Sequence, residues 1–276
     1  MKSHYFISGL PRSGSTLLSS ILKQNPEFYA DIASPVEALT GTAIDIVTGA
    51  ESNLTVTEYQ RKNLMYGIFE GYYKHIEKPV IFDSSRGWTK KTNFLKVLFP
   101  CTKILCPVRD IVSILNSFEV ILNKNCFYTK QINENVFSQN IFVRINELFQ
   151  REIINYHSFL QEGFALNPEM IHFIEYENLC KEPEKIMRGV YEFLEKPYYS
   201  HDFENVGYSN ENFDRACNLK NLHTVKKRVE YNPPRNVLPP EIVKKYKEMN
   251  TEFWRENYKP DADIIEKLDK KFIEYK

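Results

Sequence analysis

The stretch that most constrains the fold lies near the start of the chain, at residues 5–18. Residues 5–7 (Tyr-Phe-Ile) predict a short strand, and the segment between Gly9 and Gly14 predicts a turn. The apolar spacing after Ser15 predicts a helix. A strand that enters a helix through a glycine-containing turn directs several backbone N–H groups, and the positive end of the helix dipole, at one point. This part of the chain therefore predicts a phosphate site.

Residues 9–16, which we call the phosphate loop, have the glycine spacing of a Walker A loop but lack its lysine. Ser15 stands in the lysine position, and the cation lies inside the loop at Arg12. The Walker lysine reaches the β- and γ-phosphates of a nucleoside triphosphate, so its replacement indicates that the positive charge approaches from another side. The residues expected to hold the phosphate are Pro11, Arg12, Ser13, Gly14, Ser15 and Thr16. The alternative is an ordinary strand–turn–helix with a surface arginine.

Three later segments also predict buried strands, at residues 80–83, 103–108 and 170–174. Helical segments separate them, and this alternation predicts a three-layer α/β fold with a central parallel sheet flanked by helices. Ligands of such folds bind at the carboxyl ends of the strands. Polar groups follow three of the predicted strands, namely the phosphate loop, the segment from Asp83 to Arg86, and Arg109. We expect them to converge on one crevice.

The expected helices cover most of the remaining apolar segments. Their approximate ranges are 15–22, 36–47, 58–75, 89–99, 110–121, 133–160, 183–194, 242–254 and 263–275. Residues 55–58 are interpreted as a capping box. Residues 29–35 and 196–240 are expected to be loops, and the second is long enough to indicate a functional role.

The composition excludes several classes of protein. No linker divides the 276 residues, so residues 1–276 are interpreted as a single domain. Lys+Arg and Asp+Glu both number 36, and this balance gives no indication of a nucleic-acid surface. No apolar stretch approaches the ~20 residues of a membrane span, and no leader segment is recognisable. The five cysteines lack metal-ligand spacing and are interpreted as free thiols, so we expect a cytoplasmic protein without a metal.

Two further patterns follow the later strands. Arg109 ends the third predicted strand, and Ser117 lies eight residues further on, about two turns along the next helix. Tyr176 follows the fourth predicted strand, and residues 222–229 are rich in basic and hydroxyl groups. The structural alternatives are a helix-capping salt bridge, a core aromatic residue and a solvated run of charge.

In this order along the chain, the patterns resemble those of the sulfotransferase family, which uses 3′-phosphoadenosine 5′-phosphosulfate (PAPS). The resemblance runs from Tyr5 to about Val229, and residues 83–88 resemble the bacterial-type members. It implies a P-loop NTPase-like architecture in which the phosphate loop holds the 5′-phosphosulfate and Arg109 and Ser117 bind the 3′-phosphate. Tyr176 would lie against the adenine. A late loop would close the cofactor site through Thr224, Lys226, Lys227 and Arg228.

The reaction implied by this resemblance is in-line transfer of the sulfuryl group from PAPS to a hydroxyl or amine of an acceptor. Arg12 and Arg86 are expected to stabilise the charge that builds on the leaving phosphate, so no metal is expected. The acceptor must also lose a proton. Glu37 is the expected general base, and Asp83 is the second choice.

The acceptor, a small molecule or a peptide, is not identified by the sequence. Residues 36–75 and 123–140 are expected to wall its pocket, with aromatic side chains such as Phe127, Tyr128 and Phe137. The oligomeric state also stays open. Lys220, Thr224 and Val225 fit the family's dimer motif, but its acidic residue, Glu230, falls one position late.

Two other functions stay open on the sequence alone. A P-loop kinase or NTPase would use Asp83 as its Walker B carboxylate, although Ser15 in the lysine position argues against it. A non-catalytic nucleotide-binding protein would keep the loop, although retention of Arg12, Arg109 and Ser117 together argues against loss of activity.

Overall fold

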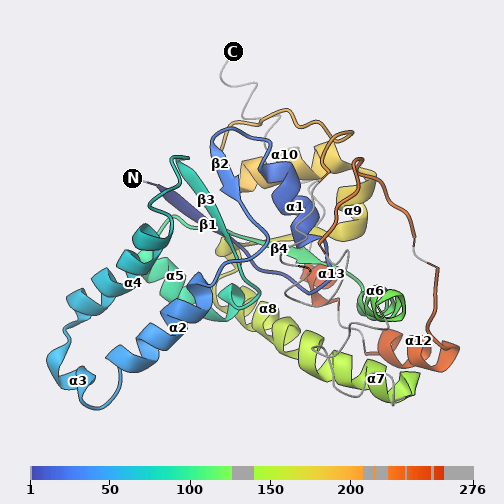
Figure 1. Cartoon of the computed structure of the whole chain (residues 1–276), viewed down its shortest axis with the longest axis horizontal. Helices are drawn as coiled ribbons and strands as arrows, with labels where there is room; N and C mark the ends of the chain where they lie inside the picture. The colour runs from blue at the N-terminus through green and yellow to red at the C-terminus, as the bar shows by residue number, and fades with distance from the viewer. Residues whose placement is uncertain are drawn as a thin grey trace.

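A single parallel sheet organises the molecule (Figure 1). The computed structural model describes residues 2–125, 140–207, 214, 223–233, 235–249 and 252–257. In these residues five strands run in the order β2-β3-β1-β4-β5. Their bounds are β1 Ser3–Ile7, β2 Phe28–Ala30, β3 Val80–Ser84, β4 Ile104–Val108 and β5 Ile171–Glu175. All neighbouring strands are parallel, which confirms the predicted α/β fold.

Helices connect the strands and cover both faces of the sheet (Figure 1). The α-helices are α1 Ser15–Leu22, α2 Val36–Val47, α3 Ser52–Thr55, α4 Glu58–Tyr72, α5 Thr92–Leu98, α6 Ile111–Lys124, α7 Ile141–Leu148, α8 Ile154–Leu166, α9 Tyr176–Lys181, α10 Pro183–Phe193, α12 Pro240–Lys247 and α13 Phe253–Asn257. The shorter turns are the 3-10 helices η1 Trp88–Lys91 and η4 Pro168–Met170 and the π-helix η3 Phe149–Ile153. None of the helices in the described ranges combines the length and apolar character needed to cross a membrane.

The side chains of β1 alternate between two cores. Phe6 packs with Ile81 into the core that α4, α5, α6 and α8 cover. Tyr5 and Ile7 point to the opposite face, where they join Phe82 and the apolar residues of α1, α9 and α10. Because helices cover both faces, the central strands are buried along almost their whole length. This burial explains why the sequence shows continuous apolar runs at β3 and β4.

The structure differs from the prediction at the edge of the sheet. Residues 28–30, which overlap the expected loop at 29–35, form β2, and Phe28 pairs with Val80 of β3. An edge strand of three residues is too short to show a hydrophobic period, so its pairing depends on the neighbouring strand. The capping box also lies elsewhere. Thr57, and not Thr55, caps α4, with Thr57 Oγ1 accepting from Gln60 N at 3.3 Å and Gln60 Oε1 accepting from Thr57 N at 2.9 Å.

Two long predicted helices are divided in the structure. The helix expected at 133–160 begins, within the described residues, at its cap Asn140 and continues through the π-helical turn η3 to Leu166. The helix expected at 242–254 consists of α12 and α13. Residues 133–139 and the predicted helix at 263–275 lie outside the described residues, as do Phe127, Tyr128 and Phe137.

Candidate active site

The phosphate loop connects the carboxyl end of β1 to α1 and is fixed to β4. Leu10 N donates to Pro107 O at 3.0 Å, and the buried Ser13 hydroxyl lies 2.7 Å from the same carbonyl oxygen. Arg12 and Gly14 have positive φ angles of 56° and 94°. Gly14 is the N-cap of α1 and, as a glycine, has no side chain that could cap the N–H groups of the first turn. These N–H groups are a preformed site for an anion.

Arg12 lies in a cluster with two residues that come from β4 and α6. Its Nε donates to Ser117 Oγ at 3.2 Å, and Arg109 Nη1 donates to its backbone oxygen at 3.4 Å. The structure therefore brings together the two predicted anion-binding segments. Burial and the charge of Arg109 lower the pKa of Arg12 to about 10, with a smaller effect from Arg86. Arg12 stays positively charged at neutral pH, and two guanidinium groups in a buried site create a strong attraction for anions.

Tyr176 and Glu177, which follow β5, hold Arg109 in place. Arg109 Nε donates to Glu177 Oε1 at 2.9 Å, and the guanidinium carbon lies 4.3 Å from the centre of the Tyr176 ring. The Tyr176 ring also packs against Gly14, because a methyl group placed on Gly14 would lie 2.6 Å from Tyr176 Cδ2. The predicted contact of Tyr176 with adenine stays a prediction. The structure shows that its ring lies beside Gly14 of the phosphate loop.

Gly14→Ala is expected to abolish the binding of adenosine 3′,5′-bisphosphate. A side chain at φ 94° costs about 1–2 kcal/mol, and its Cβ would collide with the Tyr176 ring. Both effects displace the backbone N–H groups that face the anion. Thermal shift with this nucleotide measures the change. Gly67→Ala is the matched control, since a methyl group at Gly67 of α4 meets nothing within 4 Å. Binding by Gly14→Ala at wild-type affinity would contradict the assigned role of the loop.

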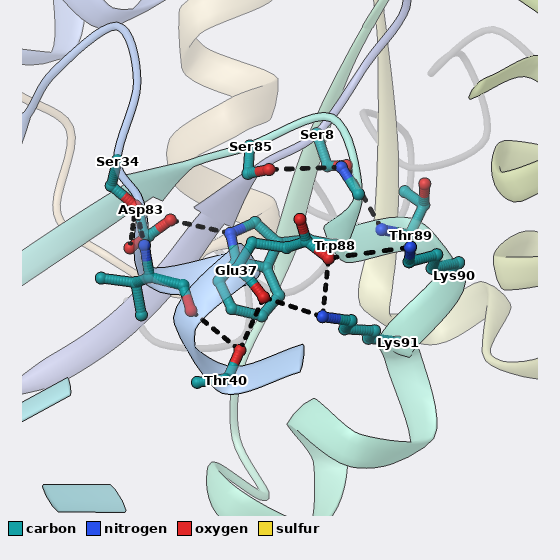
Figure 2. A network of polar contacts seen from close by, with 12 residues as sticks. Ser8, Ser34, Glu37, Thr40, Asp83, Ser85, Trp88, Thr89, Lys90 and Lys91 are labelled. Atoms are coloured by element: carbon teal, nitrogen blue, oxygen red, sulfur yellow. Dashed lines mark hydrogen bonds and ion pairs between the residues drawn. The ribbon is translucent and has the colours of Figure 1, made fainter. Parts of the chain in front are cut away.

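A second polar network follows β3 and is centred on Asp83 (Figure 2). Asp83 is fully buried, and its carboxylate accepts hydrogen bonds at 2.7 Å from Ser34 Oγ, Tyr73 Oη and Trp88 Nε1. Burial raises the pKa of Asp83, while these three hydrogen bonds act in the opposite direction. Both carboxylate oxygens are occupied by protein donors. Asp83 therefore fixes the loop after β3, and its carboxylate is buried away from the surface.

Glu37, on the first turn of α2, faces the same loop (Figure 2). Lys91 Nζ lies 2.6 Å from Glu37 Oε1, and Lys90 Nζ lies 3.9 Å from it. The carboxylate also packs against Gly87, because a methyl group there would lie 2.6 Å from Glu37 Cδ. Glu37 is thus paired with lysine ammonium groups, an arrangement that its predicted role as a base did not anticipate.

Arg86 extends from this loop toward the helix after the π-helical turn. Its Nη1 lies 3.6 Å from Glu152 Oε2, and its guanidinium carbon lies 5.4 Å from the centre of the Tyr156 ring. The guanidinium remains partly exposed, and its charge contributes to lowering the pKa of Arg12. The charges of Arg86 and Arg12 therefore act on each other, and the catalytic role of both arginines stays a prediction.

The basic residues of the late loop have local partners. Lys226 Nζ lies 3.3 Å from Glu230 Oε1, and Arg228 Nε lies 3.1 Å from Glu204 Oε2. Thr224 and Lys227 are exposed. In the described residues, no contact joins these four side chains to the phosphate loop, and their role as a cofactor lid stays a prediction.

His223, in the same segment, was missed by the sequence reasoning. Its Nδ1 lies 2.7 Å from Asp214 Oδ1, and the charges of Arg12 and Arg86 both act on its ring. The only indication in the sequence was its place within residues 222–229, the predicted late loop. Its carboxylate partner precedes it by nine residues of irregular sequence, and no helical or strand spacing connects the two.

The sulfotransferase family profile matches residues 5–200, so the chain belongs to the sulfotransferase family. No curated protein sequence matches it. Among solved structures, it resembles the sulfotransferase domain from the curacin biosynthetic pathway, with 18% identity, a TM-score of 0.53, and coverage of 90% of this chain and 98% of that domain. It also resembles a sulfotransferase from Alicyclobacillus acidocaldarius, with 16% identity, a TM-score of 0.50, and coverage of 78% and 89%.

Proposed function

We propose that this protein transfers the sulfuryl group of PAPS to a hydroxyl or amine of a small-molecule or peptide acceptor. The observation that carries the proposal is the cluster of Arg12, Arg109 and Ser117 at the carboxyl ends of β1 and β4, in a chain that belongs to the sulfotransferase family. We interpret residues 1–276 as one domain that acts in the cytoplasm, as the sequence predicts.

PAPS carries two phosphate groups, and the site offers two places for them. The uncapped N–H groups of α1, with the Ser15 and Thr16 hydroxyls, suit the 5′-phosphosulfate. Arg109 suits the 3′-phosphate, because Glu177 fixes its Nε and the planar guanidinium can present its remaining donors to an anion. Ser117 would share this phosphate. In this proposal Lys226 and Arg228 leave Glu230 and Glu204, and the exposed Thr224 and Lys227 turn with them, when the late loop closes on the cofactor.

The chemistry requires stabilisation of the leaving phosphate. During in-line transfer the new bond joins the acceptor atom to sulfur, and the bond between sulfur and the bridging oxygen breaks. The electron pair of that bond goes to the 5′-phosphate of adenosine 3′,5′-bisphosphate. Arg12 and Arg86 supply fixed positive charge for this step, in the role that magnesium has in kinases. The proposal therefore includes no metal.

The alternative of a P-loop kinase or NTPase fits the site less well. Such an enzyme places a lysine where this chain has Ser15, and it uses a strand-end carboxylate to hold magnesium. Asp83 already accepts three hydrogen bonds from Ser34, Tyr73 and Trp88. A non-catalytic nucleotide-binding protein would bind adenosine 3′,5′-bisphosphate and transfer nothing.

Two measurements test the proposal together. Thermal shift should show stabilisation by adenosine 3′,5′-bisphosphate but not by ATP with magnesium. Incubation with ³⁵S-labelled PAPS and a panel of alcohols, phenols, amines and tyrosyl peptides should label at least one acceptor. Stabilisation by ATP with magnesium alone would favour the kinase, and nucleotide binding without any transfer would favour the non-catalytic protein.

Arg109→Ala is expected to weaken binding of adenosine 3′,5′-bisphosphate about 10- to 100-fold, because a charge-assisted hydrogen bond contributes about 1.5–3 kcal/mol. Transfer at saturating PAPS should fall much less, since Arg109 is not assigned to the reacting atoms. Isothermal titration calorimetry measures the first effect and single-turnover kinetics the second. Arg188→Ala, on the exposed face of α10, is the control. Unchanged affinity in Arg109→Ala would remove the assigned 3′-phosphate site.

A further inference from the structure

His223 and Asp214 form a pair that resembles the histidine–carboxylate arrangement of general-base catalysts. His223 Nδ1 lies 2.7 Å from Asp214 Oδ1, and the backbone N–H of His223 donates to both oxygens of the same carboxylate, at 3.0 and 3.3 Å. Asp214 is buried and His223 is mostly buried. One carboxylate therefore holds both the ring and the backbone of the histidine.

The pair lies in the electrostatic field of the two arginines assigned to sulfuryl transfer. Among the described residues, Asp214, Arg12 and Arg86 are charged groups that act on His223, and the charge of Asp214 in turn acts on Arg12. Burial lowers the pKa of His223, and the two arginines add to this effect, against the opposing effect of Asp214. The imidazole is therefore neutral at neutral pH, the protonation state that a base requires.

The contact with Asp214 also selects the tautomer. An ionised carboxylate only accepts hydrogen bonds, so the ring proton lies on Nδ1 and the lone pair lies on Nε2. A neutral imidazole with its lone pair on the nitrogen opposite a carboxylate is the form that removes a proton from a hydroxyl.

We propose that His223 is the general base of sulfuryl transfer and that Asp214 is its positioning residue. This inference rests on the function proposed above. Nε2 takes the proton of the acceptor hydroxyl as the acceptor oxygen bonds to sulfur and the sulfur–phosphate oxygen bond breaks. The proton leaves His223 for solvent when the sulfated product departs.

This assignment replaces the sequence-based choice of Glu37. The Glu37 carboxylate forms an ion pair with Lys91 at 2.6 Å and packs against Gly87. In this proposal Glu37 holds the loop that carries Arg86, and its removal acts on the position of that loop.

The test compares two phenols as acceptors of ³⁵S from labelled PAPS, with release to water counted in the same assay. 4-Methoxyphenol needs a base, whereas 4-nitrophenol is largely ionised in weakly alkaline buffer. His223→Gln should lower the single-turnover rate with 4-methoxyphenol, or with water, by about 10²- to 10⁴-fold, and the rate with 4-nitrophenol far less. His75→Gln, an exposed histidine beyond α4, should match the wild type.

The variant Asp214→Asn tests whether Asp214 orients the His223 ring, and binding of the nucleotide shows whether the variant still folds. Loss of the carboxylate charge lowers the pKa of His223 further, so the acidic limb of the pH–rate profile should move to lower pH while the maximal rate falls. Binding of adenosine 3′,5′-bisphosphate should stay at the wild-type value in both variants. In wild-type protein labelled with ¹⁵N-histidine, the His223 resonances should report a protonated Nδ1 and an unprotonated Nε2.

Undiminished transfer by His223→Gln, equal losses with the two phenols, or the opposite tautomer would overturn the assignment and leave the proposed function intact. A wild-type protein that transfers label to neither phenol nor water nor any acceptor of the panel would overturn the proposed function and the inference with it. A fall confined to Glu37→Gln would restore Glu37 as the base.

Discussion

Arg12→Ala is expected to lower the rate of sulfuryl transfer about 100- to 1,000-fold, which corresponds to about 3–4 kcal/mol of barrier. The arginine is fixed by Ser117 and stays charged in a buried site, so its stabilisation of the leaving phosphate needs no rearrangement during the reaction. Single-turnover kinetics with labelled PAPS at saturating concentration measures the loss. Binding of adenosine 3′,5′-bisphosphate should fall less than the rate.

Two control variants show whether the lower transfer rate of Arg12→Ala comes from loss of the arginine side chain itself. Arg12→Lys keeps a positive charge but loses the Nε donor that contacts Ser117, so it should recover only part of the rate. Arg188→Ala on α10 should have the wild-type rate. Full turnover by Arg12→Ala would contradict the mechanism, because the remaining cations would then be sufficient for the chemistry.

Asp83→Ala is expected to have the largest effect on folding, a loss of about 3 kcal/mol or more in the free energy of unfolding. The substitution leaves the buried Tyr73 hydroxyl and Trp88 Nε1 without their acceptor, and each buried donor left unpaired costs about 1–3 kcal/mol. Urea unfolding followed by fluorescence measures the change. Asp45→Ala, at an exposed position of α2, should change the free energy by less than about 0.5 kcal/mol. A similarly small effect for Asp83→Ala would show that the network contributes little to stability.

Much of the fold could be predicted because it depends on local patterns. The runs at β3 and β4 are buried on both faces and are therefore almost continuously apolar in the sequence, whereas β5 at the edge of the sheet is buried at Ile171, Phe173 and Ile174. β2 could not be found in this way, since its three residues are too few to show a hydrophobic period and their place is set by pairing with β3 and by packing in the core. The division of the helix expected at 242–254 into α12 and α13 was also missed, because the apolar spacing in the sequence continues from one helix to the next.

The candidate site was predictable where strand ends determine it. The proximity of Arg12 and Arg109 could be expected from the topology, because neighbouring parallel strands end at the same edge of a sheet. Ser117 lies within α6 and was assigned with Arg109 only through the resemblance to the sulfotransferase family; in the structure it contacts Arg12. Side-chain partners over long sequence distances could not be inferred. The sequence contains no sign that Lys91 pairs with Glu37 or that Asp214 holds His223. Lys226 and Arg228 likewise looked available, although nearby carboxylates bind them.

The hydrogen bonds around Asp83 also limit what protein engineering could make of this scaffold. The substitution Ser15→Lys would introduce the side chain that binds the triphosphate in nucleotide hydrolases. It would not create a magnesium site. A metal ion bound by Asp83, at the end of β3, would have to displace the hydrogen bonds from Trp88, Tyr73 and Ser34. Conversion to a nucleotide hydrolase would thus require rebuilding the packed interior behind the loop, in addition to the loop itself.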